Sequence, residues 1–307
     1  MYSNKNRSEE YISKLLTFIN KEYGFKAAGI TPAKRGFYGE TWRLDTEGVV
    51  YFLKLVYATK LKDIYEQSFP VVQHLGDHGI DFISKIVKTV RGDLFTRFDG
   101  AALGVFDWID GELIETDTTK IPEYQMLAKV YTVPTDGISI PREDFSCKCA
   151  DKVFKQWSAL DDGHVRALLE KNRSTIEHRA ARLKLFSKIC SGDTAGFVIT
   201  HGDAGGNFIM NGDRCFIVDW DYALHAPPER DAWVMCSREW ARDAFHEALR
   251  QNGITHTLRR EWLAYYCYHY FFFYLMAFLD ASAQAENIED YINGWIVDSF
   301  KFADEVT

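Results

Sequence analysis

The sequence has few of the features that mark specialised classes of protein. Its 307 residues include only 7 prolines and show neither an internal repeat nor a low-complexity block, which excludes a solenoid and a proline-rich disordered arm. Basic residues are in deficit, because 36 Lys and Arg stand against 44 Asp and Glu, a formal net charge of −8. Nucleic-acid binding usually needs a basic face. We therefore expect no nucleic-acid partner, and no feature indicates a protein partner.

Cysteines with metal-ligand spacing and long apolar segments are also lacking. Of the six cysteines, only Cys147 and Cys149 lie close together, and a lone C-x-C is not a zinc pattern. The N-terminal residues MYSNKNRSEE contain no apolar stretch, so we expect no signal peptide and a cytoplasmic protein with reduced thiols. Residues 262–279 carry no charge, but five tyrosines and His269 disfavour a membrane span. We expect a buried helix there and no membrane partner.

The chain has an ordinary globular composition, 47% hydrophobic and 26% charged. The pattern of apolar residues changes along its length. Apolar spacing predicts a helix over residues 9–23 and another over 61–78. Strand patterns cover residues 41–45, 49–56, 83–90, 94–98 and 103–109. Beyond Asp110-Gly111 the patterns are helical, about 123–131, 152–160 and 165–190, apart from a β-like island over 197–220. The pattern predicts an α+β protein with a small β-rich lobe followed by a mainly helical lobe.

The island carries the strongest chemical signal. It reads FVITHGDAGGNFIM, the turn NGD, and then RCFIVDWD. A strand delivers Asp203 into a glycine-rich loop that Asn207 closes, and Asp219 follows the next hairpin. Asp203 has the chemistry to accept a hydroxyl proton, while Asn207 and Asp219 are suitable ligands for Mg²⁺. Phosphoryl transfer needs little more from a protein than positioning and charge neutralisation.

This stretch resembles the catalytic loop and metal-binding strand of the aminoglycoside phosphotransferase and choline kinase superfamily. The run VDWDYALHAPPERD, residues 218–231, is similar to its spectinomycin-type branch. The resemblance implies the bilobal protein-kinase fold, with Asp203 as the catalytic aspartate and Asn207 and Asp219 as magnesium ligands. It also implies that His201 is structural. In the same way, the resemblance implies that three further residues anchor the loop to the helical lobe: Glu229, Arg230 and Asp231.

One departure from the family pattern concerns the loop length. Most members place five residue steps between the catalytic aspartate and the asparagine, whereas Asp203 and Asn207 are four apart. We expect Gly205 and Gly206 to accommodate the shortened loop, since glycine accepts a positive φ.

The resemblance also assigns the nucleotide-binding parts of the first lobe. Gly36 and Gly39 bound a short loop that resembles a nucleotide-positioning loop. Lys54 lies inside an apolar strand, where a lysine is rare unless it is paired, and by resemblance it grips the α- and β-phosphates. Its expected partner is Glu66 on the next helix, with Asp63 as the second choice.

A hinge is expected where the last strand enters the helical lobe. Residues 105–111 resemble the family's hinge, whose backbone groups, around Phe106 and Trp108, read the purine edge. We therefore predict a first lobe over residues 1–106, a hinge over 107–112 and a helical lobe with the acceptor site over 113–307.

The predicted activity is transfer of the γ-phosphoryl of ATP, or alternatively GTP, with Mg²⁺ to a hydroxyl of an aminoglycoside or aminocyclitol antibiotic. Such a spectinomycin-like, cationic acceptor would make the chain a resistance enzyme. Acids and aromatics in the last seventy residues suit that acceptor: Asp243, Glu247, Asp280, Glu286, Glu289, Asp290, Asp298, Tyr265, Tyr266, Tyr270, Tyr274 and Trp295. The alternative is a metabolic kinase for choline, homoserine or a sugar-like acceptor.

Two other classes fit the sequence less well. A protein kinase would need a longer activation segment than the one between Asp219 and Glu229. A non-catalytic nucleotide-binding module would be expected to lose Lys54, Asp203 or Asp219, and all three are present.

Overall fold

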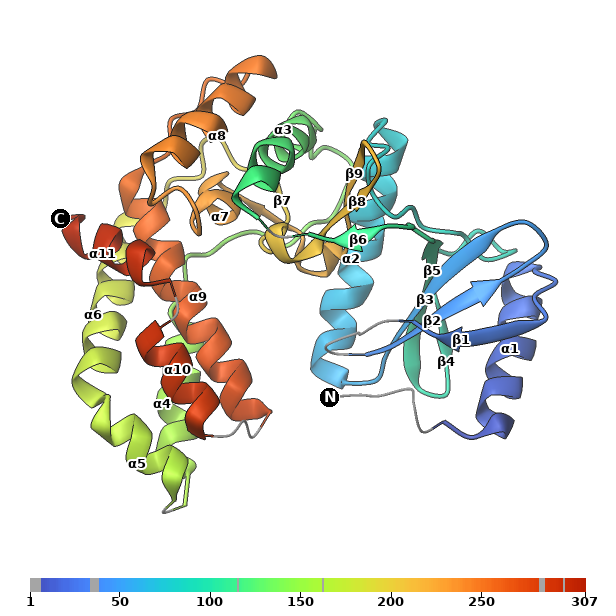
Figure 1. Ribbon diagram of the computed structural model, residues 1–307, viewed down its shortest axis with the longest axis horizontal. Helices are drawn as coiled ribbons and strands as arrows, with labels where there is room; N and C mark the ends of the chain where they lie inside the picture. The colour runs from blue at the N-terminus through green and yellow to red at the C-terminus, as the bar shows by residue number, and fades with distance from the viewer. Residues whose placement is uncertain (1–6, 34–38, 115, 162, 282–284, 295) are drawn as a thin grey trace. The chain divides into compact units, whose positions relative to one another are not determined.

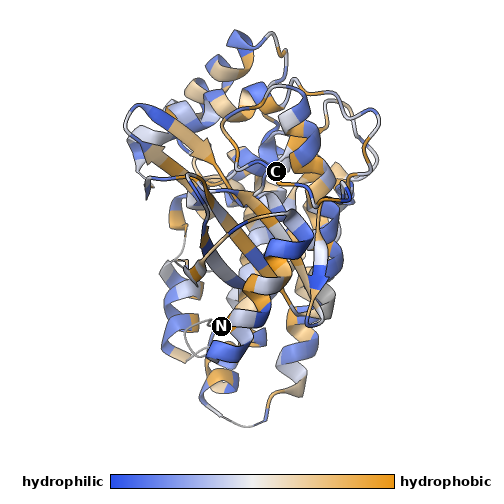
Figure 2. Cartoon of the chain, turned by 90° about the vertical axis from the view of Figure 1, so that its right-hand side faces the viewer, coloured by the Kyte–Doolittle hydropathy of each residue, from blue (hydrophilic) through white to orange (hydrophobic). Residues whose placement is uncertain are grey.

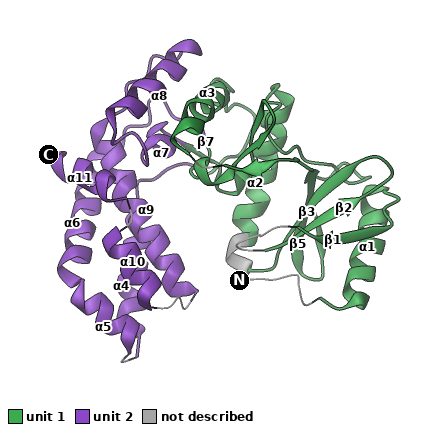
Figure 3. Cartoon of the chain, in the orientation of Figure 1, with its two compact units in different colours: residues 1–141, 201–225 green, residues 142–200, 226–307 purple. Residues whose placement is uncertain are grey.

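The computed structural model describes residues 7–33, 39–114, 116–161, 163–281, 285–294 and 296–307. The chain divides into two compact units (Figure 3): one is formed by residues 1–141 and 201–225, the other by residues 142–200 and 226–307. The predicted catalytic loop therefore belongs to the same unit as the β-rich N-terminal part. The predicted hinge lies within that unit, so the lobe boundary near residues 107–112 stays a prediction.

The first unit opens with a helix that packs on an antiparallel sheet (Figure 1). Helix α1 (Glu9–Tyr23) begins where the Ser8 hydroxyl accepts the Tyr11 N–H, and it ends at Gly24 in the left-handed region. In the described residues, five strands form the sheet in the order β1-β2-β3-β5-β4. They are β1 (Gly29–Pro32), β2 (Glu40–Asp45), β3 (Val50–Val56), β4 (Thr96–Phe98) and β5 (Ala101–Asp107). Figure 2 shows hydrophobic residues along these strands and both kinds of residue along α1.

Helix α2 (Thr59–Asp77) lies between β3 and β4 in the chain and presents buried Tyr65 and Phe69. The remaining elements of the first unit build the predicted catalytic segment. They are β6 (Glu112–Leu113), the 3₁₀ turn η2 (Asp117–Thr119), α3 (Lys120–Val130), η3 (Gly205–Asn207), β8 (Phe208–Asn211), β9 (Arg214–Ile217) and η4 (Trp220–Tyr222), with β10 (Leu224–Ala226) at its border. Strands β6, β8 and β9 form a small antiparallel sheet. The turn η4 packs against α2.

The second unit is mainly helical and is built around α9 (Arg260–Asp280), most of whose residues are buried. The other elements are α4 (Lys148–Ala159), α5 (His164–Lys171), α6 (Arg173–Cys190), β7 (Val198–Thr200), α7 (Glu229–Ala232), α8 (Glu239–Gln251), α10 (Ala285–Gly294) and α11 (Val297–Glu305). Helices α4, α6 and α11 pack on α9. The prediction of a buried helix over residues 262–279 is confirmed. Within the described residues, no helix is both long and apolar enough to cross a membrane.

Two predicted elements are corrected by the structure. Residues 83–90 do not form a strand, and Ile86 makes a single bridge to Phe106. The reason is that β4 already occupies part of the free edge of β5, and Val87 N–H bonds Val105 O beyond it. The predicted long helix over residues 165–190 is two helices, because Asn172 ends α5 with its side chain bonded to Leu168 O.

Candidate functional site

The centre of the candidate site is Lys54, in the middle of β3. It is paired with Thr41 of β2 and Gly104 of β5, and its side chain is 9% exposed. Gly104 is required here, because a Cβ would lie 2.3 Å from the ring of Phe69 on α2. An ammonium at such a position needs counter-charge, because the desolvation penalty for burying one ion alone is several kcal/mol.

Two aspartates supply that counter-charge. The Lys54 Nζ donates to Asp219 Oδ1 at 2.7 Å and also to Asp221 Oδ2, and it lies 5.2 Å from the centre of the Tyr65 ring. Burial alone would lower the pKa of Lys54, but the two carboxylates outweigh it and raise that pKa above its ordinary value. Lys54 is therefore held as a cation at the junction of β3 and η4.

The predicted pair between Lys54 and Glu66 is not formed in the structure. Glu66 accepts from Arg97 Nη2 of β4 at 2.6 Å, and Asp63, the second choice, is exposed. The physical reason is the register of α2, which turns the ring of Tyr65 toward Lys54 and Glu66 toward β4. Sequence spacing places an acid on this helix but does not determine which side of the helix faces the lysine.

Asp219 stands at a strained point of the backbone, directly before η4. Its φ of 65° and ψ of 57° are left-handed, a conformation that costs an L-residue about 1–2 kcal/mol. The buried indole of Trp220 holds the turn by donating to Ile217 O at 2.9 Å. The Asp219 side chain is 46% exposed. Burial raises its pKa, but Lys54, His201 and Asp221 together outweigh burial and lower that pKa, which favours the ionised form of this accessible carboxylate.

Asp221 is the site residue that sequence reasoning missed. Its carboxylate is 21% exposed and meets the same ammonium from the other end of the D-W-D motif. Burial and the nearby charge of Asp219 raise its pKa, against the effect of Lys54. The sequence shows this acid as the second aspartate of the D-W-D motif, but not its contact with Lys54, because the two residues are 167 positions apart.

His201 joins the predicted catalytic loop to the predicted metal-binding segment. Its Nδ1 accepts the Asp203 N–H at 3.1 Å, which leaves Nε2 protonated to donate to Val218 O at 2.9 Å. The imidazole is 1% exposed and lies edge-on to the Trp220 ring, with centroids 4.6 Å apart. These bonds support the structural role that the resemblance implied for His201.

Asp203 and Asn207 lie together in the loop that precedes β8. The Asn207 amide donates to Asp203 O at 2.8 Å and, more weakly, to Asp203 Oδ2 at 3.4 Å. Because the NH₂ group is used in this way, the Oδ1 of Asn207 remains as the acceptor of the amide. Val218 N–H donates to Asn207 O at 3.0 Å, so the loop is also tied to the strand that leads to Asp219.

The shortened loop closes differently from the expectation. Neither Gly205 nor Gly206 has a positive φ. The loop instead tightens into η3, with Asn207 N–H bonded to Ala204 O at 3.0 Å. Gly206 is useful for its lack of a side chain, since a Cβ there would lie 3.4 Å from Asp203 Oδ1.

The oxygen atoms of Asn207 and Asp219 suit a hard cation that completes its coordination shell with waters and substrate phosphates. In the described part of the chain, no group of three or more His, Cys, Asp or Glu side chains forms a metal cluster. Asn207 Oδ1 and the exposed Asp219 carboxylate provide two oxygen donors. Mg²⁺ is commonly bound by one or two carboxylates together with waters and substrate phosphates, and two protein ligands therefore fit it.

The nucleotide loop and the hinge are only partly described. Gly36 lies outside the described residues. Gly39 is buried, and a Cβ on it would lie 2.3 Å from Leu55 O, so the loop ends in a close backbone approach to β3. In the hinge, Phe106 stacks on Phe69 with centroids 5.7 Å apart, and the Trp108 indole donates to Asp110 at 2.7 Å. Their roles in nucleotide binding stay predictions.

The segment after the D-W-D motif is bound into the helical unit at two points. Arg230 donates to the Thr200 hydroxyl at 2.9 Å, and fully buried Glu229 accepts from His256 at 3.0 Å and from the Arg259 N–H. These contacts lie within the helical unit, and the anchoring of the loop by Glu229, Arg230 and Asp231 stays a prediction.

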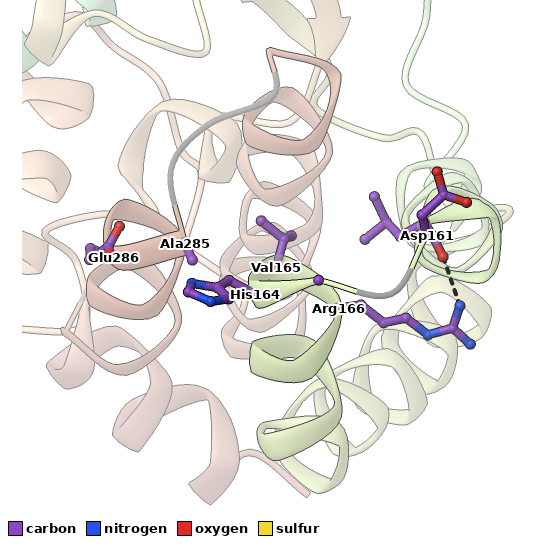
Figure 4. Close-up of a pocket in the computed structure, with 8 residues that line it drawn as sticks. Asp161, His164, Val165, Arg166, Ala285 and Glu286 are labelled. Carbon is purple, nitrogen blue, oxygen red and sulfur yellow. Dashed lines mark hydrogen bonds between the residues drawn. The ribbon is translucent and has the colours of Figure 1, made fainter.

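Pockets on the described surface of the helical unit include the following two. The first has a volume of about 550 Å³ between the start of α5 and the start of α10, and it is lined by Asp161, His164, Arg166 and Glu286 among others. Figure 4 shows His164 near Ala285 on one side of this pocket. On the other side, Arg166 donates to Leu160 O, drawn as a dashed line. The second, of about 760 Å³, is lined by Phe278, Asn287, Asp290, Tyr291, Asn293 and Gly294.

The other acids of the last seventy residues are mostly engaged with cations. Asp280 pairs with Lys152, Glu289 with Lys171, Glu247 with Arg250 and Asp298 with Arg238. Tyr265, Tyr266 and Tyr270 are buried in the core around α9, and Trp295 lies outside the described residues. Of the acids predicted for the acceptor, Glu286 lines the first of these pockets and Asp290 lines the second.

The fold defines the class of protein: it is the bilobal, α+β kinase-like fold that was predicted. The sequence model of the phosphotransferase enzyme family matches residues 29–266. The chain belongs to this family, and the family resemblance stated from the sequence is confirmed.

Solved structures share the fold at low sequence identity. A spectinomycin phosphotransferase in complex with ADP and spectinomycin has a TM-score of 0.70 and 18% identity, over 95% of this chain and 93% of that one. An aminoglycoside phosphotransferase in complex with GDP and kanamycin has a TM-score of 0.63 and 14% identity, over 94% and 98%. A choline kinase from Cryptosporidium parvum has a TM-score of 0.62 and 11% identity, over 95% of both chains. No curated protein sequence matches this chain.

Proposed function

We propose that this protein is a cytoplasmic small-molecule kinase. It transfers the γ-phosphoryl group of ATP, with GTP as the alternative donor, to a hydroxyl of an aminoglycoside or aminocyclitol antibiotic and thereby confers resistance. The observation that carries the proposal is the convergence of Lys54, Asp219 and the Asp203–Asn207 loop in one unit, joined through His201.

The residues divide the work of phosphoryl transfer between them. Asp203, at the exposed end of the loop, accepts the proton of the acceptor hydroxyl. The hydroxyl oxygen forms a bond to the γ-phosphorus while the bond between that phosphorus and the leaving ADP oxygen breaks. Lys54 provides the positive charge for the nucleotide phosphates, which compete for it with the two aspartates. Asn207 Oδ1 and Asp219 would hold Mg²⁺, which when bound neutralises charge on the phosphates.

The acceptor class is supported by similarity and by charge. The first structural relatives include a protein crystallised with spectinomycin, and the pockets of the helical unit carry the carboxylates of Asp161, Glu286 and Asp290. Such carboxylates suit ammonium groups of an antibiotic. The metabolic alternative, a kinase for choline, homoserine or a sugar-like acceptor, is supported by the likeness to choline kinase.

The test is nucleotide-dependent phosphorylation across a matched panel. The purified chain is incubated with Mg²⁺ and ATP or GTP, and with spectinomycin, kanamycin, choline, homoserine or a thio-sugar. ADP or GDP release is followed together with the mass of the acceptor. A gain of one phosphate on spectinomycin that is absent with Asp203→Ala supports the proposal. Phosphorylation of choline or a sugar with no transfer to either antibiotic would establish the metabolic alternative.

A further inference from the structure

The phosphate-binding lysine of this chain has an unusual neighbourhood on its helix side. From α2, Tyr65 faces Lys54: its ring centre is 5.2 Å from the ammonium, and its hydroxyl donates to Lys54 O at 3.4 Å. Tyr65 is 1% exposed, so this ring fills the space beside the ammonium.

The acid that sequence spacing assigns to this helix is committed elsewhere. Glu66 forms an ion pair with Arg97 at 2.6 Å, and the Arg97 side chain is 59% exposed. An ion pair this open to solvent is worth little, about 0–1 kcal/mol. Glu66 therefore contributes to the surface between α2 and β4 and not to the charge balance of Lys54.

The two aspartates that contact Lys54 differ in their access to solvent. The Asp219 side chain is 46% exposed, whereas that of Asp221 is 21% exposed and lies in the turn that packs against α2. Asp219 can therefore turn one oxygen outward to a metal and a nucleotide. Asp221 is the carboxylate that is placed to stay with Lys54 when a nucleotide is bound.

We propose that Asp221 of η4, and not an acid of α2, is the residue that positions Lys54 in this chain. This inference rests on the proposed function for the role of Lys54 toward phosphates, but the ion pair itself does not. Asp221 acts through Lys54: it holds the extended side chain against β3 and keeps the ammonium aimed at the phosphate site after Asp219 engages the metal.

The kinetic test compares Asp221→Asn with Glu66→Gln, two isosteric losses of a carboxylate. Asp221→Asn should lower kcat/KM for the nucleotide about 10²-fold, in the range for a supporting residue of a site. The loss should be mainly in kcat, as we also expect for Lys54→Met. Glu66→Gln should change it less than about 5-fold, as expected for an exposed pair. An equal loss in both variants, or a larger loss in Glu66→Gln, would overturn the inference.

A stability test separates this inference from the proposed function. Thermal unfolding is measured for Asp221→Asn and Glu66→Gln, each in the presence of Lys54 and in a Lys54→Met background. Coupling should shift Tm by about 2 °C or more for Asp221→Asn and not for Glu66→Gln. Additive effects of Lys54→Met and Asp221→Asn would overturn the ion pair. If wild-type protein binds no nucleotide while the coupling is present, the proposed function fails and the ion pair stands.

Discussion

Lys54 Nζ lies 2.7 Å from Asp219 Oδ1, although the two residues are separated by 165 positions in the chain. One belongs to the first sheet and the other to the segment that returns from the helical unit. This contact joins the predicted phosphate-binding residue to the predicted metal ligand.

Asp219 and Asp203 should respond differently to substitution. Asp219→Ala should weaken Mg²⁺-dependent nucleotide binding and lower turnover by about 10³-fold, because a bound metal supplies several kcal/mol of charge stabilisation. Asp203→Ala should leave Mg²⁺–nucleotide binding intact while kcat falls about 10²- to 10⁴-fold, the range for a general base. Titration calorimetry and steady-state kinetics on both variants measure this. Asp219→Asn is the control for backbone strain: asparagine tolerates the left-handed backbone, so this variant removes the negative charge without adding strain. Unchanged turnover in either alanine variant would contradict its assignment.

His201 should matter for the geometry of the loop and not for proton transfer. His201→Phe keeps a ring beside Trp220 but removes the acceptor for Asp203 N–H and the donor for Val218 O. Loss of these buried hydrogen bonds should lower the free energy of unfolding by about 1–3 kcal/mol, and kcat should fall more than nucleotide affinity. Chemical denaturation and kinetics check this. His178→Phe, on the exposed face of α6, is the matched control. A His201→Phe protein with wild-type stability would show that the bridge is unimportant.

His269 should make the stability of the helical unit depend on pH. Burial lowers the pKa of His269, against the opposing effect of Glu143, and its Nδ1 lies 3.2 Å from the Tyr265 hydroxyl. A lowered folded pKa means that the stabilising contribution is complete above the unfolded value, about 6.5, and is lost as pH falls through the folded value. Tm should therefore decrease below about pH 6.5, and less steeply in His269→Phe. Equal slopes for both proteins would contradict the assignment.

The acceptor should show a salt dependence that the nucleotide does not. If the acceptor is a cationic antibiotic, its KM should rise as ionic strength increases from about 0.01 M to 0.15 M, because the Debye length falls from roughly 30 to 8 Å. Neutralising Glu286 or Asp290, which line pockets, should flatten that dependence. Glu247→Gln is the control, as Glu247 is already paired with Arg250. A KM that ignores salt, or efficient use of an uncharged sugar, would favour the metabolic alternative.

The family and several local elements could be predicted from the sequence because they depend on local order. The helix over residues 9–23 has its cap, its apolar face and its terminal glycine within one stretch of chain. The residues from His201 to Asp219 are close in sequence, so their proximity was predictable, although the 3₁₀ turn that closes the loop was not. Burial of the apolar run at residues 262–279 was also predictable, since its composition excludes both solvent and lipid.

What the tertiary structure alone decided were contacts across long stretches of chain. Whether Glu66 or Asp221 meets Lys54 depends on how far α2 is rotated about its axis, and that rotation is set by Phe69 packing over Gly104 and by Tyr65 beside the ammonium. Helical periodicity places Glu66 on α2 but leaves its direction open. Similarly, the strand pattern at residues 83–90 could not reveal that β4 and residues 85–87 share one edge of β5, because competition for a sheet edge is resolved only when all candidate strands are packed together.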